Sequence, residues 1–307
     1  MDDQPGDTRR LRPPTRSHAD PLRQTTASLV RWHAGLATSI EDELVVEEPL
    51  EIRLRVGGDP LSTETIAVIM RTPGADDELA VGFLYSEGLI VSRDELGVIA
   101  AGLDDDGLPS PNVLDLIPAS GAALAERMRL GGVSRAFAVN ASCGVCGRNS
   151  IAAVCAAFPP LAAHEPLTTT EVLCSLPDRL RAEQRVFAST GGLHAAGLFA
   201  PDGSLLALRE DVGRHNAVDK LIGRALLDNT LPLRQAMLLV SGRLSFEIVQ
   251  KVVAAGIPLV AAVSAPSSLA VDLARESGVT LAAFLRGPSM NIYTHPARID
   301  VTAVAQA

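Results

Sequence analysis

The chain has 307 residues, of which 47% are hydrophobic and 21% charged, and its formal net charge is −9. This length and composition predict a mostly globular protein with two domains or one large one. The negative charge argues against nonspecific binding to nucleic acid, and the sequence has no apolar run of about 18 residues that would predict a membrane span.

The beginning of the chain differs from the rest. Residues 1–25 are rich in arginine, proline, aspartate and threonine without hydrophobic periodicity, which predicts a disordered tail. Residues 8–12 resemble a twin-arginine export signal, but Pro13 and Pro14 follow where an apolar segment should stand. We therefore expect a cytoplasmic protein whose four cysteines are thiols rather than a disulfide framework.

The next hundred residues contain several strand-like patterns. Residues 50–56 are apolar at every second position and end in a Gly-Gly-Asp-Pro turn, which predicts a half-buried strand. Residues 65–71 and 113–117 predict two more strands, and an acidic segment between them opens a helix that should end near Gly88. We expect these elements to form a smaller α+β domain over residues 26–130.

The remainder of the chain, residues 131–307, is expected to form an α/β domain. Three runs are apolar on both faces and alternate with helices, which predicts parallel strands joined by right-handed crossovers. These runs cover residues 237–240, 259–263 and 280–285, with helices between them at 246–254 and 268–275. Earlier in this domain we expect strands at 136–139, 193–199 and 205–208 and helices at 150–158, 171–184 and 216–227.

Small and hydroxyl-bearing residues follow each of the three apolar runs. The loops cover residues 241–245, 264–268 and 286–289, and two of them contain an arginine, Arg243 or Arg286. Ligands of open α/β sheets bind beyond the carboxyl ends of the strands, and two of these loops lead into helix N-termini, which suit phosphate. Each loop alone is explained as a tight turn, but three at one edge favour a site for a phosphate-bearing ligand.

A cysteine pair, Cys143 and Cys146, stands between a predicted strand and a predicted helix. The helix N-terminus and the nearby Arg148 favour the thiolate form, while Gly144 and Gly147 leave room for a partner's sulfur. The pattern alone is compatible with structural zinc, thiol–disulfide exchange, a persulfide relay or coincidence.

Zinc is poorly supported, because a structural site needs three or four ligands. Cys155 and Cys174 lie in apolar segments and are expected in the core. Only His194 and His215 remain, and they are remote in the sequence. We therefore expect no permanent metal.

The densest polar cluster of the chain covers residues 210–216. It is interpreted either as a solvated helix start with Asn216 as its cap, or as a group that reaches the same sheet edge because it follows a strand. His194 lies in a strand of small residues and is interpreted as a core histidine rather than a catalyst.

Seven segments, in order, resemble the FdhD family, the sulfurtransferases that serve formate dehydrogenases. The resemblance covers most of the chain after residue 40 and is far more specific than a lone cysteine pair. The segments are Thr72–Gly74 with Leu79–Leu84, Ser142–Gly147, Thr190–Ala196, Glu210–Lys220, Ser241–Glu247, Ser264–Ala270 and Asn291–Thr294.

By this resemblance, the protein accepts sulfur from a cysteine desulfurase as a persulfide on its catalytic cysteines, Cys143 and Cys146. It then passes the sulfur to the molybdenum bis(molybdopterin guanine dinucleotide) cofactor, a bound substrate, before that cofactor enters formate dehydrogenase. The resemblance also implies a homodimer and a cytidine-deaminase-like, three-layer C-terminal domain, although the His-x-Glu of the zinc deaminases is missing. The expected contacts to this cofactor or a guanine nucleotide are Phe284, Leu285, Arg286, Gly287, Pro288, Ser289, Ser241, Gly242, Arg243, Ser264 and His215.

Two other functions remain open at this point: a thioredoxin-like oxidoreductase that uses the same cysteines, and a noncatalytic chaperone that only holds the cofactor. Sulfur transfer requires the cysteine loop to reach the ligand. We therefore expect residues 141–148 to be mobile and to open toward the three strand-end loops. The opposite expectation is a rigid zinc knot on the far side of the domain.

Overall fold

The structure is a computed structural model that describes residues 23–55, 63–119, 150–162 and 166–301. The strands are β1 (Gln24–His33), β2 (Leu36–Val45), β3 (Glu48–Arg55), β4 (Thr63–Arg71), β5 (Leu96–Leu103), β6 (Pro109–Pro118), β7 (Thr168–Thr169), β8 (His194–Phe199), β9 (Leu205–Asp211), β10 (Met237–Val240), β11 (Leu259–Ala262), β12 (Thr280–Arg286), β13 (Ser289–Thr294) and β14 (Ile299–Asp300). The helices are α1 (Asp76–Ser86), α3 (Ile151–Ala157), α4 (Thr170–Glu183), α5 (Arg185–Thr190), α6 (Arg214–Leu227), α7 (Phe246–Ala254) and α8 (Ser268–Glu276).

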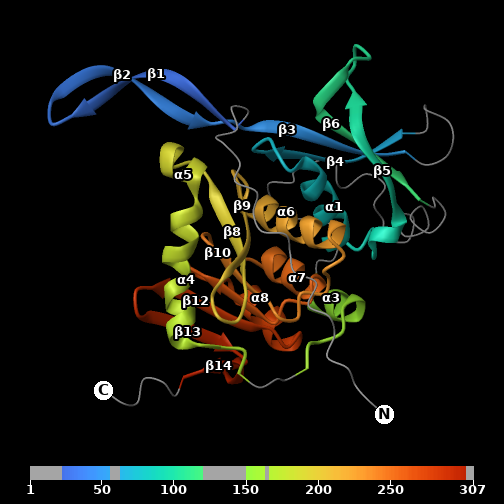
Figure 1. The fold of residues 1–307 in the computed structure, drawn as a ribbon, viewed down its shortest axis with the longest axis vertical. Helices are drawn as coiled ribbons and strands as arrows, with labels where there is room; N and C mark the ends of the chain where they lie inside the picture. The colour runs from blue at the N-terminus through green and yellow to red at the C-terminus, as the bar shows by residue number, and fades with distance from the viewer. Residues whose placement is uncertain (1–22, 56–62, 120–149, 163–165, 302–307) are drawn as a thin grey trace.

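The strands form two main sheets (Figure 1). A four-stranded sheet has the order β4-β3-β6-β5 and a six-stranded sheet the order β13-β12-β11-β10-β8-β9, while β1–β2 and β14–β7 form separate pairs. The chain is therefore a mixed α/β protein, as the sequence predicts. Within the described residues, no helix has both the length and the apolar character needed to span a membrane.

Alternation along β3 builds the core beneath the four-stranded sheet. Leu50, Ile52 and Leu54 are buried and belong to one apolar cluster with the side chains of α1. Gly88 follows the end of α1 as predicted, and its φ of 71° is a conformation that favours glycine. The sequence does not predict β5, because this edge strand has no alternation of apolar and polar residues and only its Gly102 is buried.

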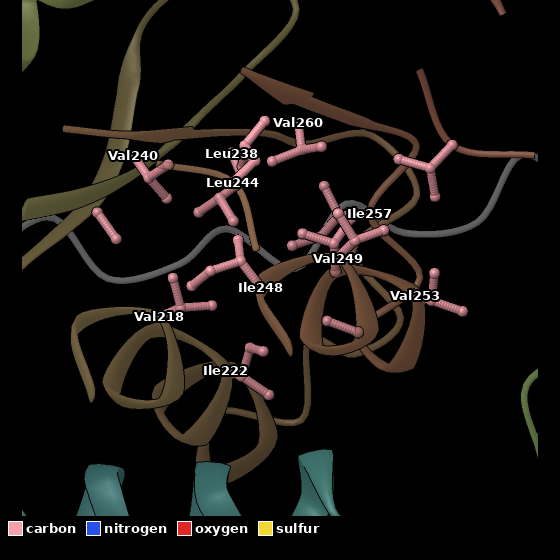
Figure 2. Packing of buried hydrophobic residues seen from close by; sticks show 14 of the residues in the cluster. Val218, Ile222, Leu238, Val240, Leu244, Ile248, Val249, Val253, Ile257 and Val260 are labelled. Atoms are coloured by element: carbon pink, nitrogen blue, oxygen red, sulfur yellow. The ribbon is translucent and has the colours of Figure 1, made fainter. Parts of the chain in front are cut away.

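The six-stranded sheet confirms the parallel strands expected from the three apolar runs. β10, β11 and β12 are parallel, and β8 and β13 flank them in the antiparallel direction. Leu238, Val240 and Val260 point to one face and pack with α6, α7 and α8. Figure 2 shows them above the side chains of α6 and α7. Met237 and Leu239 point to the other face and pack with α4. The sheet is thus the middle of three layers, and the likeness to cytidine deaminases stays a prediction.

The two main sheets are joined where α1 packs against α6. A Cβ atom on Gly82 of α1 would overlap the carbonyl oxygen of Asp219, and one on Gly223 of α6 would overlap that of Glu78. The two helix backbones approach this closely because both contact positions lack a side chain. Glu78 also accepts two hydrogen bonds from Arg209 of β9. This contact fixes α6, whose first residues belong to the site described below.

A feature that the sequence patterns do not predict is the hairpin of β1 and β2, which extends away from the rest of the chain (Figure 1). Its turn residues, Ala34 and Gly35, both have positive φ, as tight hairpin turns require. β1 begins at Gln24, within the segment expected to be a tail. The expected domain boundary at residues 130–131 lies outside the described residues, so the division into domains stays a prediction.

Candidate functional site

The three loops that follow β10, β11 and β12 lie together at the carboxyl edge of the six-stranded sheet. The backbone N–H of Leu244 donates to the carbonyl of Ala265 at 3.1 Å, and the N–H of Ser267 donates to the carbonyl of Leu244 at 2.9 Å. The N–H of Phe284 donates to the carbonyl of Ser264 at 3.2 Å. These bonds join the first loop to the second and the second to the end of β12.

β8 and β9 extend the same edge. Because β8 runs antiparallel to β10, its first residue, His194, lies at the carboxyl end of β10 and pairs with Asp211 at the end of β9. Ser241 secures this junction, since its N–H donates to the Ala195 carbonyl and its hydroxyl accepts a hydrogen bond from the Ala195 N–H, both at 2.9 Å. One of the expected cofactor contacts, Ser241, therefore also holds β8 against β10.

The loop after β12 is an exposed turn over residues 286–289, with φ of 53° at Gly287. Phe284 is half-buried and has φ of 57°, an unusual conformation for a bulky residue, where a register shift interrupts the pairing of β12 with β13. The Leu285 side chain is buried in the cluster that packs against α4. Leu285 is therefore an expected contact whose side chain serves the core and does not reach a ligand.

The helix N-termini at this edge differ in how they are capped. Ser267 caps α8, because its hydroxyl accepts a hydrogen bond from the Ala270 N–H at 3.3 Å. Ser245 precedes α7 and Gly213 precedes α6, and neither forms a side-chain cap. The N-termini of α6 and α7 are therefore better suited than that of α8 to binding an anion.

His215, an expected cofactor contact, lies at the start of α6 beside the start of α7. Its Nε2 is 3.1 Å from the Ser245 hydroxyl and 3.8 Å from a carboxylate oxygen of Glu247. Burial lowers the pKa of His215 to about 4, with Lys251 and Arg214 adding to the shift and Glu247 opposing it. His215 is thus a neutral imidazole near pH 7 and a hydrogen-bonding group rather than a cation.

Arg214 is the cation of this edge that the sequence analysis missed. Its Cδ and the Nδ1 of His194 each lie 3.5 Å from where a Cβ atom on Gly242 would stand. The Nε of Arg214 is buried and has no hydrogen-bond partner among the described residues. Burial and then Arg214 lower the pKa of His194, while Asp211 opposes the shift. A bound anion would supply the acceptor that the guanidinium lacks. The signal in the sequence is the Arg-His pair that begins three residues after the end of β9.

The remaining expected contacts lie on the same joined loops with different exposure. Gly242 is buried and Ser264 is half-buried, whereas Arg243 and Arg286 are exposed. The attraction between an exposed arginine and an anionic ligand is screened by water and salt, so each exposed arginine contributes less binding free energy than a buried one. Arg214 is therefore the stronger candidate for direct contact with a phosphate group.

The polar cluster between β9 and α6 is not a solvated helix start, and Asn216 is not its cap. Gly213 takes the cap position, and the Asn216 amide turns inward, where it donates to the Met70 carbonyl and to the Asp211 carboxylate at 2.8 Å each. Asp211 is fully buried and binds the Lys220 ammonium at 2.7 Å. This network fixes the start of α6 against β4 and β9.

A second buried ion pair stabilises the other side of α6. Lys251 of α7 contacts both carboxylate oxygens of Asp219, at 2.7 and 2.8 Å, and the Ser86 hydroxyl of α1 donates to the same carboxylate at 3.0 Å. The pair links α1, α6 and α7. It also places the positive charge of Lys251 near His215, where it favours the neutral imidazole.

The expected catalytic residues, Cys143 and Cys146, lie outside the described residues, as does the loop at 141–148. The helix that follows them, α3, begins after Ser150 and packs against α8. The segment after α3 reaches the amino edge of the sheet, where the N–H of Leu161 donates to the carbonyl of Ser277 at 2.9 Å. A path from the cysteines to the candidate site therefore stays a prediction.

The other two cysteines, Cys155 and Cys174, were expected in the core, but both are only partly buried, and Cys155 packs against the edge of an apolar cluster. Burial raises the pKa of the Cys155 thiol, and Glu276 adds to the shift. Burial also raises the pKa of Cys174, with a further contribution from Glu171. Neither thiol has the lowered pKa of a reactive cysteine. Across the ranges that the structure describes, no three His, Cys, Asp or Glu side chains are grouped as metal ligands.

We expect His215 to stay neutral as the pH is lowered through 6 and to gain its proton near pH 4. The unfolded chain binds this proton from about pH 6.5 downward, so stability should fall as the pH is lowered from 6.5 toward 4. NMR titration of the ring protons checks this, and Glu247→Gln should lower the pKa further because Glu247 opposes the shift. A midpoint near 6.5 in the folded protein would contradict the buried environment described here.

Known proteins resemble this chain over most of its length. Residues 45–300 match the model of the FdhD/NarQ family. A protein of Mycolicibacterium paratuberculosis named sulfur carrier protein FdhD is 55% identical over 269 residues, covering 87% of this chain and 95% of that protein. A protein of Sulfolobus acidocaldarius with the same name is 42% identical over 267 residues, again with 87% and 95% covered.

A solved structure supports the same relationship. It is a crystal structure of a protein from Desulfotalea psychrophila that is described as a formate dehydrogenase accessory protein. The two folds match with a TM-score of 0.66 at 25% sequence identity, covering 90% of this chain and 99% of the other. The match of the family model, together with these relatives, shows that the chain belongs to the FdhD/NarQ family.

Proposed function

We propose that this protein is a cytoplasmic sulfur carrier that serves the maturation of a formate dehydrogenase. The names of the relatives support the sulfur-carrying role, and the description of the solved relative supports the link to formate dehydrogenase. The structural observation that carries the proposal is the sheet edge where, within the described residues, the Nε of Arg214 lacks an acceptor beside two histidines and the loop that follows β10. An edge of this kind suits an anionic substrate. A cofactor that contains nucleotide diphosphates is such a substrate, because its diphosphate groups are negatively charged.

The sulfur is carried by the cysteine pair. The thiolate of Cys143 attacks the outer sulfur of a persulfide on a cysteine desulfurase, so that a new S–S bond forms and the desulfurase thiolate leaves. The carrier then holds a persulfide. Attack by the Cys146 thiolate on the inner sulfur releases the outer sulfur as sulfide and leaves a Cys143–Cys146 disulfide. Two thiols three positions apart are suited to this release because they can reach each other.

The acceptor of the sulfur is the molybdenum bis(molybdopterin guanine dinucleotide) cofactor, bound at the carboxyl edge as a substrate. Arg214 donates to its phosphate oxygens, and the neutral His194 and His215 add hydrogen bonds without further charge. The uncapped N-termini of α6 and α7 favour the same negative groups. The exposed Arg243 and Arg286 attract the ligand from the rim of the site.

Replacing Arg214 with glutamine should weaken the binding of guanosine diphosphate by about 1–3 kcal/mol, because an amide cannot replace a charge-assisted hydrogen bond. Calorimetry at constant salt measures the change. Arg243→Ala and Arg286→Ala should each cost less than about 1 kcal/mol, since both side chains are exposed. Arg275→Gln is a matched control, because Arg275 lies in the last turn of α8, at the opposite edge of the sheet.

Unchanged affinity in Arg214→Gln, with an intact fold, would remove this edge as the substrate site. Disulfide reductase activity without any nucleotide affinity would favour the thioredoxin-like alternative. Cofactor binding without sulfur on either cysteine would favour the noncatalytic chaperone. Sulfur loading and nucleotide binding are separate measurements, so each half of the proposal is tested by itself.

A further inference from the structure

The segment Thr72–Gly74, which follows β4, is one of the seven segments of the family resemblance, and the proposed function gives it no role. Its first residue, Thr72, is fully buried, and all three of its polar groups bind the connection between β9 and α6. The N–H donates to the Asp211 carboxylate at 3.3 Å, the hydroxyl accepts a hydrogen bond from the Val212 N–H at 3.3 Å, and the carbonyl accepts one from the Lys220 ammonium at 2.9 Å. A residue at the end of the four-stranded sheet therefore holds the six-stranded sheet at the start of α6.

The loop that Thr72 holds sets the position of the first turn of α6. The Asp211 carboxylate accepts a hydrogen bond from the Gly213 N–H at 2.8 Å, so the loop binds one of its own N–H groups. The preceding N–H, that of Val212, has the Thr72 hydroxyl as its acceptor. Gly213 is the cap residue of α6 and has no side chain to anchor the helix. The first turn, which begins with Arg214, therefore takes its position from the backbone of this loop.

We propose that Thr72 is a positioning residue of the substrate site, whose hydroxyl keeps this loop in the conformation that directs Arg214 toward the anionic ligand. The inference rests on the proposed function, because it concerns the same carboxyl edge. The ion pair of Asp211 with Lys220 does not supply this restraint, since it binds the Asp211 side chain and not the Val212 N–H. Binding groups must be held within about 0.5 Å of their productive geometry, so a displaced loop weakens the site.

The opposing interpretation is that Thr72 only stabilises the junction between the two sheets. Losing its hydroxyl would then lower the stability of the fold without changing how the folded protein binds a ligand. Thr72→Val separates the two interpretations, because valine keeps the branched shape of threonine and removes the acceptor of the half-buried Val212 N–H. The measurements are made on the folded protein, which circular dichroism confirms for each variant.

Calorimetry with guanosine diphosphate at constant salt tests the proposal on the full chain. Thr72→Val should raise the dissociation constant about five- to tenfold, the effect of one lost hydrogen bond. Thr72→Ser keeps a hydroxyl and should restore most of the affinity. Thr230→Val is the matched control, because the Thr230 hydroxyl donates to the Ala225 carbonyl at 3.0 Å at the opposite end of α6. This control should bind guanosine diphosphate as the unsubstituted protein does.

The pKa of His215, in the first turn of α6, provides a second readout that a change in stability alone does not move. Burial is the main reason why this pKa is about 4. A displaced first turn admits water to the imidazole, so NMR titration should show the pKa rising toward 6.5 in Thr72→Val and staying near 4 in Thr230→Val.

Three outcomes would overturn the inference, and they differ in what else they overturn. Unchanged affinity and an unchanged His215 pKa in Thr72→Val, while Arg214→Gln weakens binding, would refute the role of Thr72 alone. Unchanged affinity in both Thr72→Val and Arg214→Gln would refute the proposed substrate site and this inference with it. Equal weakening in Thr72→Val and Thr230→Val would show that the hydroxyl of Thr72 serves only the stability of the fold.

Discussion

Serine in place of Cys143 should reduce sulfur loading from a cysteine desulfurase to below about 1% of that of the unsubstituted protein, because a hydroxyl is not ionised at neutral pH and forms no persulfide. Mass spectrometry after incubation with a desulfurase and cysteine measures the effect. In the unsubstituted protein we expect one added sulfur on the peptide that contains Cys143 and Cys146. With Cys146→Ser, loading should persist while sulfide release slows, since no second thiolate is available to form the disulfide.

The other two cysteines supply the control for this experiment. Cys155→Ser and Cys174→Ser should load sulfur as well as the unsubstituted protein, because burial raises the pKa of both thiols. Full loading in Cys143→Ser together with loss in Cys155→Ser or Cys174→Ser would contradict the assignment of the carrier cysteine.

Lys220→Met should lower the free energy of unfolding by about 3–5 kcal/mol, because it leaves the fully buried Asp211 carboxylate without its counter-ion. Lys220 also donates to the Thr72 carbonyl at 2.9 Å, so the substitution removes two buried hydrogen bonds from the junction of β4, β9 and α6. Denaturation by urea measures the change. Since α6 begins with Arg214, nucleotide affinity should fall as well.

A matched control removes the cation of an exposed ion pair. Arg275 contacts Asp272 at 2.9 Å with both side chains about half exposed, and Arg275→Met should change the unfolding free energy by less than about 1 kcal/mol. A loss below 1 kcal/mol in Lys220→Met would show that Asp211 finds another partner or takes up a proton, and the network would then not fix the start of α6.

Hydrophobic periodicity alone determined the architecture around the six-stranded sheet. The expected helix at residues 246–254 has the bounds of α7, and the three apolar runs form parallel strands. These elements were predictable because their hydrophobic patterns differ. A strand buried on both faces is a short continuous apolar run, whereas an amphipathic helix has apolar residues every three or four positions. The resemblance in seven segments also determined the family, which the comparisons confirmed.

Only the tertiary structure showed which polar side chains are buried in the fold and which lie at the candidate site. The same local pattern suits a solvated helix start and a buried network, and only the approach of β4 showed that Asn216 and Asp211 are buried. Only the packing of the loop at Gly242 against α6 and β8 placed Arg214 beside His194. The hairpin of β1 and β2 has exposed residues on both faces, so it lacks the alternation by which half-buried strands are recognised. Long-range contacts determine burial, and burial decides whether a polar side chain serves the fold or a ligand.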